Sequence, residues 1–235
     1  MPECHSTNTL LFELAQKTSL PEGTLLITNN QILGRGQRGN SWEAEPGMNL
    51  TFSLLLNPHF LSSQEQFYLT IAISLGIHDF LSSRLSGSLK IKWPNDLMVD
   101  ERKIAGILIE NSLMGESIQQ SVVGIGLNVN QEVFSHPSAT SMIVEAGTEY
   151  SLPIELNLLL ERLESRYIQL RSGNVAALKA DYLKNLFRIG ETHEFVSNDE
   201  RFIGRVEGID TIGKLKVCVN QTERSFGLKE ISFLK

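Results

Sequence analysis

Glycine and arginine are interspersed in the stretch ILGRGQRGNSW, residues 32–42. Glycine lets a backbone approach a ligand closely and adopt left-handed conformations. Arginine binds a carboxylate or a phosphate through a planar fork of N–H donors. The stretch has neither helical nor strand periodicity, and its spacing differs from the GxxxxGK[ST] phosphate loop. It indicates a loop that closes over an anion, but a mobile solvated loop explains these residues about equally well.

A second set of polar groups lies in KIKWPNDLMVDERKIAGILIE, residues 90–110. Lys92 stands at the predicted end of a strand, because Pro94 cannot donate to the ladder. With Asn95 and Asp96 it offers a cation, an amide and a carboxylate within a tight turn. Pro-Asn-Asp is also ordinary turn chemistry. On the residues alone, Trp93 is expected in the core, and so is Trp42 of the first stretch.

A third candidate is GIGLNVN, residues 124–130. Glycine within a strand permits another backbone or a ligand to approach closely. Asn128 has the amide needed to hydrogen-bond the edge of a heterocycle. A buried asparagine bonded to the backbone explains it equally well.

The elements that must position these groups follow from capping and periodicity. Residues 5–18 predict a helix with its N-cap at Ser6, Thr7 or Asn8 and an apolar stripe of Leu11, Leu14 and Ala15. Further helices are predicted over 63–85, with a capping box from Ser63 to Gln66, and over 155–171 and 174–186. Strands are predicted in 23–28, 48–56, 88–93, 103–110 and 121–130, and a loop over 29–48.

From Phe187 onward the sequence changes to short alternating runs separated by turn-rich segments. Five such runs predict a small β-barrel. We therefore expect two domains, residues 1–186 and 187–235. The second contains none of the polar motifs above, so it is expected to support activity without contacting the substrates.

Composition limits the function classes. The 235 residues are 41% hydrophobic and 20% charged, which is ordinary for a folded globular protein. A net charge of −6 argues against a nucleic-acid-binding surface. No apolar run reaches the roughly 20 residues of a membrane span, and the start lacks signal-peptide features. Two distant cysteines fit the cytoplasm, and the histidines lack metal-ligand spacing.

The order of these motifs resembles that of biotin protein ligases over nearly the whole chain. The resemblance rests on STN at residues 6–8, Gln31 followed by GRGQRGNSW, KWPNDL at 92–97, RKIAGILIE at 102–110 and GIGLNVN. KWPND together with the glycine-arginine loop is highly specific to that family. The family's loop usually reads GRGRxGRxW. Here Arg35 keeps its place, Gln37 and Asn40 stand where arginines are common, and Arg38 is an additional cation.

The resemblance implies an α/β (α+β) fold with a mixed central sheet and flanking helices, like class II synthetases, plus a small C-terminal Src-homology-like β-barrel. It implies a ligase that uses ATP, biotin and Mg²⁺, without indicating the Mg²⁺ ligands. Lys92 and Arg35 are implied as the catalytic cations. The implied biotin-binding residues are Ser6, Thr7, Asn8, Gln31, Gly34, Arg35, Gly36, Gln37, Lys92 and Gly106. The implied nucleotide-binding residues are Arg38, Asn40, Trp42, Asn95, Asp96 and Asn128.

The implied partner is the biotin carrier domain of acetyl-CoA carboxylase or a related carboxylase, with no nucleic acid and no membrane. A homodimer is compatible with the resemblance. Three other functions were weighed: a repressor, a degenerate biotin-binding module and a lipoate ligase. Only five residues precede STN, which leaves no room there for the repressors' DNA-binding domain. The intact KWPND argues against the degenerate module, and KWPND combined with the loop argues against a lipoate ligase.

Overall fold

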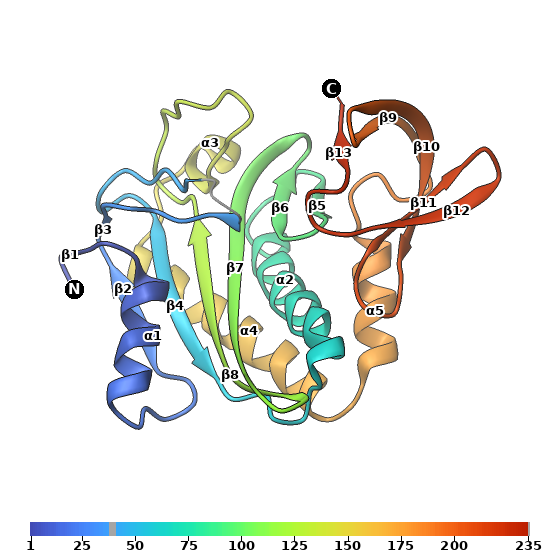
Figure 1. Ribbon diagram of the computed structural model, residues 1–235. Coiled ribbons are helices and arrows are strands. Elements are labelled where there is room, and N and C mark those ends of the chain that lie inside the picture. Colours follow the sequence, from blue (N-terminus) through green and yellow to red (C-terminus); the bar gives the residue numbers. More distant parts are fainter. Residues whose placement is uncertain (38–40, 235) are drawn as a thin grey trace.

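A six-stranded antiparallel sheet forms the centre of the molecule in the computed structural model, which describes residues 1–37 and 41–234 (Figure 1). In spatial order its strands are β2 (Leu25–Thr28), β4 (Leu50–Leu56), β8 (Ser117–Leu127), β7 (Arg102–Met114), β6 (Asp96–Val99) and β5 (Leu89–Lys92). A short parallel pair, β1 (Glu3–Cys4) and β3 (Asn30–Gln31), lies beside it. A mixed central sheet is expected from the resemblance. Every strand pair of the central sheet is antiparallel, and the parallel pairing occurs beside it in β1–β3.

The two faces of the sheet differ in chemistry, because successive side chains on a strand point to opposite sides. On β4, Phe52 packs into the main hydrophobic core, whereas Ser53 and Leu55 face the other way. On β8, Ile125 belongs to the core face and Gly124 to the opposite one. The core face is thus apolar, and the opposite face, called the polar face here, carries small and polar residues beside a minor apolar cluster that includes Leu55.

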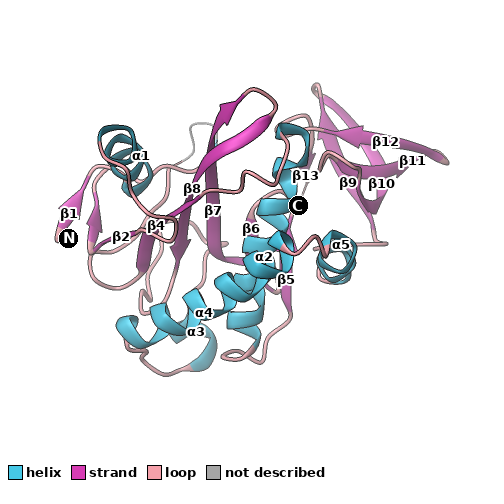
Figure 2. Ribbon diagram, turned by 90° about the horizontal axis from the view of Figure 1, so that it is seen from below, coloured by secondary structure: helices cyan, strands magenta, loops and turns pink. Residues whose placement is uncertain are grey.

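Helices cover both faces (Figure 2). On the polar face lies α1 (Thr7–Lys17), where Leu11 packs on Leu55 and Val122. On the core face lie α2 (Gln66–Ser82) and α4 (Leu152–Arg171), with α5 (Val175–Lys184) beside α2 and the short α3 (Met142–Ala146) further along. The two long helices approach closely at Gly76, where a Cβ would lie 2.9 Å from the Leu163 Cα. No helix in the described part of the chain is long and apolar enough to cross a membrane.

The C-terminal strands form a second antiparallel sheet. In spatial order they are β12 (Thr222–Phe226), β11 (Leu215–Val219), β10 (Glu200–Ile209), β9 (Thr192–Ser197) and β13 (Ser232–Phe233). Asn198 and Asp199 both have positive φ, 50° and 63°, as two-residue hairpin turns require. The five predicted strands are confirmed. The predicted domain boundary, between residues 186 and 187, falls between α5 and β9. One hydrophobic core runs through both parts, so the division into two domains stays a prediction.

Several local expectations need correction. The capping box is formed by Ser62 and Glu65, not by Ser63 and Gln66. The Glu65 carboxylate accepts from the Ser62 N–H at 3.0 Å and from its hydroxyl at 2.7 Å, before a 3₁₀ turn, Ser63–Glu65, leads into α2. On α1, Leu14 is 39% exposed and lies outside the apolar stripe. The strand β6 and the helix α3 were not anticipated.

Candidate functional site

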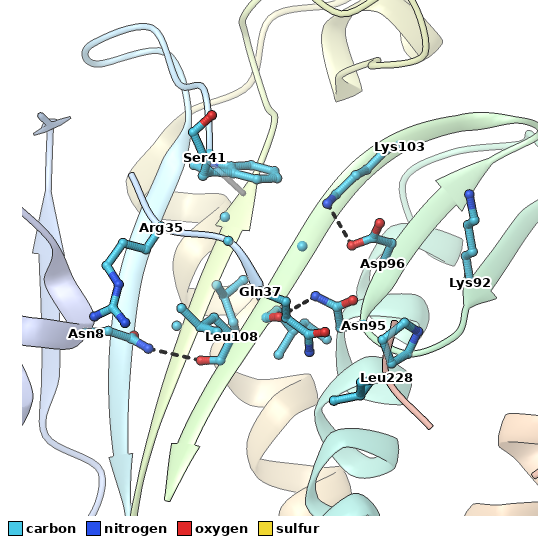
Figure 3. Close-up of a pocket in the computed structure, with 18 of the residues that line it drawn as sticks. Asn8, Arg35, Gln37, Ser41, Lys92, Asn95, Asp96, Lys103, Leu108 and Leu228 are labelled. Atoms are coloured by element: carbon cyan, nitrogen blue, oxygen red, sulfur yellow. Dashed lines mark hydrogen bonds and ion pairs between the residues drawn. The ribbon is translucent and has the colours of Figure 1, made fainter. Parts of the chain in front are cut away.

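A cavity of about 350 Å³ opens on the polar face of the sheet, between α1, the glycine-arginine loop and the C-terminal segment (Figure 3). Most of the residues singled out from the sequence line it. They are Ser6, Thr7, Asn8, Gln31, Arg35, Gly36, Gln37, Trp42, Lys92, Asn95, Asp96 and Gly106. Segments from three distant parts of the chain therefore meet at one site, as the motif order predicts.

Glycines form the floor of this cavity. Gly106 of β7 pairs with Gly126 of β8, and Leu108 pairs with Gly124. A Cβ on Gly126 would lie 2.3 Å from the Trp42 ring, and one on Gly124 would lie 2.3 Å from the Asn8 side-chain oxygen. Close approach to a glycine-rich strand was predicted, and here the groups that approach are the side chains of the site itself.

The end of the cavity beside α1 is neutral and rich in hydrogen bonds. Ser6 caps the helix by accepting from the Thr9 N–H. The side-chain oxygen of Gln31 accepts from the Thr7 backbone N–H at 2.8 Å, which leaves the amide nitrogen of Gln31 as the free end of that side chain. The buried hydroxyl of Ser53 lies 2.8 Å from the Thr7 hydroxyl and donates to the Asn8 oxygen at 2.6 Å. This end offers fixed donors and acceptors without net charge.

The other end carries lysines. The Lys103 ammonium lies 2.7 Å from an Asp96 carboxylate oxygen and 5.4 Å from the centre of the Trp42 ring. Lys103 and Gly106 both line the cavity although three positions separate them on β7, so strict alternation would place them on opposite faces. A bulge resolves this, because the pairing with β6 shifts register between Leu97 and Met98.

Lys92 lines the cavity where the edge strand β5 meets the C-terminal sheet. Its ammonium lies 5.9 Å from the centre of the Phe187 ring and 5.7 Å from that of Phe233. Burial lowers the pKa of Lys92 below that of an exposed lysine, an effect that Asp96 opposes and Arg188 reinforces. A lysine held this way is a partly desolvated cation, available to an anion that enters the cavity.

Arg35 is directed away from these lysines and toward α1 (Figure 3). Its guanidinium donates to the Glu110 carboxylate at 3.1 Å and to the Thr9 hydroxyl at 3.0 Å. This geometry anchors the loop on β7 and α1. The resemblance implies direct anion binding by Arg35, whereas here its guanidinium is bonded to Glu110 and Thr9.

Two further predicted residues lie elsewhere. Gly34 does not line the cavity, and its carbonyl accepts from the Trp42 N–H at 3.0 Å. Asn128 is 3% exposed and does not line the cavity either; its amide donates to the Thr140 carbonyl, which is the structural role weighed for it. Arg38 and Asn40 lie outside the described residues. Trp93 is 7% exposed and belongs to the core, as expected.

Sequence reasoning missed several groups. Lys103 was read only as part of a strand, because the bulge that turns it into the cavity leaves no sequence signal. Ser53 and Glu110 do leave a signal, since each is a polar residue beside an apolar strand run. The C-terminal segment was expected to stay clear of the substrates, yet it lines the cavity with Leu228, Lys229, Ile231, Ser232 and Phe233.

The described residues contain no group of three His, Cys, Asp or Glu side chains placed to hold a metal ion. Among the described residues that line the cavity, the acidic side chain is that of Asp96. Mg²⁺ keeps most of its waters and needs only one or two protein carboxylates when phosphates supply the remaining ligands. The donor set therefore fits a Mg²⁺ ion that arrives with a nucleotide, and Asp96 would be its protein ligand.

Known proteins are similar to this chain in sequence and in fold. A biotin–[acetyl-CoA-carboxylase] ligase of Paracoccus denitrificans is 31% identical over 221 residues, covering 89% of each chain. The bifunctional ligase/repressor BirA of Bacillus subtilis is 28% identical over 231 residues, covering 96% of this chain and 69% of its own. The biotin protein ligase from Aquifex aeolicus in complex with biotin and ATP superimposes with a TM-score of 0.83 at 24% identity, covering 100% of this chain and 97% of its own. Residues 2–128 match the biotin/lipoate A/B protein ligase family, and this chain belongs to that family.

Proposed function

We propose that this chain is a biotin protein ligase. A carboxylate oxygen of biotin attacks the α-phosphorus of ATP, the bond to the β-phosphate breaks, and biotinyl-adenylate and pyrophosphate form. A lysine amine of a biotin carrier domain then attacks the activated carbonyl carbon, AMP leaves, and the amine loses a proton. The observation that carries this proposal is a single cavity with a neutral hydrogen-bonding end and a lysine-lined end.

The neutral end suits the ureido ring of biotin, which is uncharged and both donates and accepts hydrogen bonds. Thr7 fixes the Gln31 side-chain oxygen, so the Gln31 amide nitrogen is left to donate to a ligand carbonyl. Ser6 and the buried Thr7 hydroxyl supply further polar atoms. A site that hydrogen-bonds a substrate strongly rejects analogues that lack the matching groups.

The lysine-lined end suits the meeting of two anions. Two like unit charges 4 Å apart repel by about 4 kcal/mol at an effective dielectric of about 20. Lys103 and Lys92 supply positive charge where the carboxylate approaches the α-phosphate. A Mg²⁺ ion bound through Asp96 and the phosphates would neutralise further charge. Trp42, packed against the glycine floor, offers a surface for the planar adenine or for the acyl chain.

The acceptor is a carrier-domain lysine, which must reach the activated carbonyl beside Lys103. The C-terminal segment forms the wall on that side, so the second sheet contributes to the reaction chamber. Cys4 and Cys218 are both free thiols, which fits the reducing cytoplasm, where ATP is also available. A homodimer stays a prediction that sedimentation of the purified protein would test.

Isotope exchange between ATP and pyrophosphate tests the first step. We expect exchange to depend on biotin and to be absent with lipoate or octanoate. Faster exchange with lipoate than with biotin would assign the chain to the lipoate branch of its family instead. Incubating the preformed adenylate with a carrier domain, and with a carrier whose acceptor lysine is changed to arginine, tests the second step. Transfer to the first carrier alone is expected.

A further inference from the structure

We propose that Glu110 is a positioning residue of this site: its carboxylate holds Arg35 of the loop and Asn8 of α1 together, and so sets where Trp42 lies on the glycine floor of the cavity. One carboxylate oxygen accepts from the Arg35 guanidinium at 3.1 Å and the other from the Asn8 amide at 2.9 Å. Glu110 does not line the cavity, so it acts through these partners. The consequence for catalysis rests on the proposed function, whereas the positioning itself does not.

Both N–H donors of the Asn8 side chain are used, and its oxygen accepts one hydrogen bond. Asn8 is 3% exposed, its oxygen accepts from the Ser53 hydroxyl, and its amide nitrogen donates to the Leu108 carbonyl at 3.1 Å and to Glu110. Its oxygen also lies where a Cβ on Gly124 would stand. A buried amide with one donor left unsatisfied is costly, so Glu110 fixes the side-chain orientation at the start of α1.

Arg35 passes this constraint to the loop. Arg35 and Ser41 form an antiparallel bridge, and the Trp42 N–H donates to the Gly34 carbonyl, so Arg35 and Trp42 are tied to each other through the backbone. The Trp42 ring rests on Gly106, four residues before Glu110 on β7. Gly106 and Glu110 share one face of the strand, roughly 13 Å apart at the usual rise per residue. A single strand therefore holds both sides of the loop.

The charge of Glu110 gives the pair a further consequence. An unpaired carboxylate beside a site for anionic substrates would repel them, and Arg35 neutralises it. The side chains of Arg35 and Glu110 are 50% and 34% exposed, so dissolved salt screens their attraction. Loop position should consequently depend on ionic strength through this one pair.

Glu110→Gln tests the proposal, because it keeps the size of the side chain and an acceptor for Asn8 while removing the charge. We expect the KM for biotin and for ATP in the exchange assay to rise about tenfold, the effect of losing a charged hydrogen bond, with a smaller change in kcat. The tryptophan emission of the ligand-free protein should shift as Trp42 changes its surroundings. Glu116→Gln, an equal charge change on the exposed β7–β8 turn, should change none of these quantities.

Arg35→Gln breaks the same pair from the loop and serves if Glu110→Gln does not fold. The effects of Arg35→Gln and of Glu110→Gln on KM should not multiply in the double variant, because each substitution removes the same ion pair. Raising the salt concentration should shift the wild-type emission toward that of Glu110→Gln and leave the variant unchanged. Independent, multiplying effects, or emission in Glu110→Gln equal to wild type at all salt concentrations, would overturn the proposal. Tryptophan emission is measured without turnover, so it tests the positioning role by itself. A wild-type protein that shows no biotin-dependent exchange would reject the proposed function separately.

Discussion

Lys103 and Asp96 form an ion pair across neighbouring strands, 2.7 Å from Nζ to Oδ1, at the lysine-lined end of the cavity. The pair exists because a bulge in β7 turns Lys103 onto the same face as Gly106. The carboxylate holds the ammonium over the Trp42 ring in the ligand-free protein. If an anionic substrate binds in the cavity as proposed, Lys103 would exchange Asp96 for that anion.

Lys103→Ala is therefore expected to slow biotin-dependent ATP–pyrophosphate exchange at least 100-fold. Removing one preorganised group that stabilises developing charge costs about 3 kcal/mol or more. Lys17→Ala, a change at an exposed lysine in the last turn of α1, is the matched control and should leave the rate unchanged. A Lys103→Ala rate close to wild type would remove Lys103 from the chemistry.

The exchange rate should depend on pH through the charge of Lys92. Burial lowers its pKa from the 10.5 of an ordinary lysine, so it loses its charge at a lower pH than an exposed lysine does. The exchange rate should fall as the pH rises through that lowered pKa. In Lys92→Arg the fall should move to higher pH, because the guanidinium stays charged. Lys92→Ala should nearly abolish exchange while the circular dichroism spectrum stays native.

The same shift affects stability with the opposite sign. Between the lowered pKa of folded Lys92 and its value in the unfolded chain, the unfolded state binds more protons. The free energy of unfolding contributed by this group should therefore rise with pH across that window. Lys92→Met should remove this contribution in urea titrations. A fall in stability with pH that disappears in Lys92→Met would contradict the assignment.

Gly126→Ala should displace Trp42, because the added Cβ would stand 2.3 Å from its ring. Overpacking of this kind costs about 1–3 kcal/mol of unfolding free energy. In a Trp42→Ala background the ring is gone, and Gly126→Ala should then cost much less. Thermal unfolding of the four proteins gives the comparison. An equal cost in both backgrounds would mean that Trp42 does not lie on Gly126.

Trp93→Phe should destabilise the contact between the two sheets. The Trp93 indole N–H donates to the Gly213 carbonyl at 2.8 Å, and both groups are buried. A carbonyl left without its donor costs about 1–3 kcal/mol. Trp42→Phe is the matched control, since the Trp42 indole N–H has no hydrogen-bond partner among the described residues. Equal losses in urea unfolding for both variants would contradict this reading.

The sequence predicted what depends on local chemistry. The preferences of single residues or short periods predicted an N-cap at Ser6, Thr7 or Asn8, the strand that ends at Lys92, the glycines of β8 and the turn-rich C-terminal strands. The structure places the N-cap at Ser6. The gathering of Thr7, Gln31, Lys92 and Gly106 in one cavity followed from the family resemblance rather than from periodicity.

What was missed depends on tertiary geometry. The bulge that turns Lys103 into the cavity is a property of strand pairing, and no residue type in the sequence predicts it. The sequence predicts a free cation at Arg35, yet Glu110, 75 positions later, accepts a hydrogen bond from its guanidinium. The segment around Ser232 has no motif and reaches the cavity because β13 pairs with β9.

The wall formed by Leu228, Ile231 and Phe233 has a consequence for biosynthesis. Translation proceeds from the amino end, so the α1 end of the cavity is synthesised before this wall, and a nascent chain that stops before Leu228 lacks the wall. Biotin and ATP should then stabilise the folded chain only once the segment through Phe233 has left the ribosome, and translation products that stop before Leu228 should bind either substrate weakly.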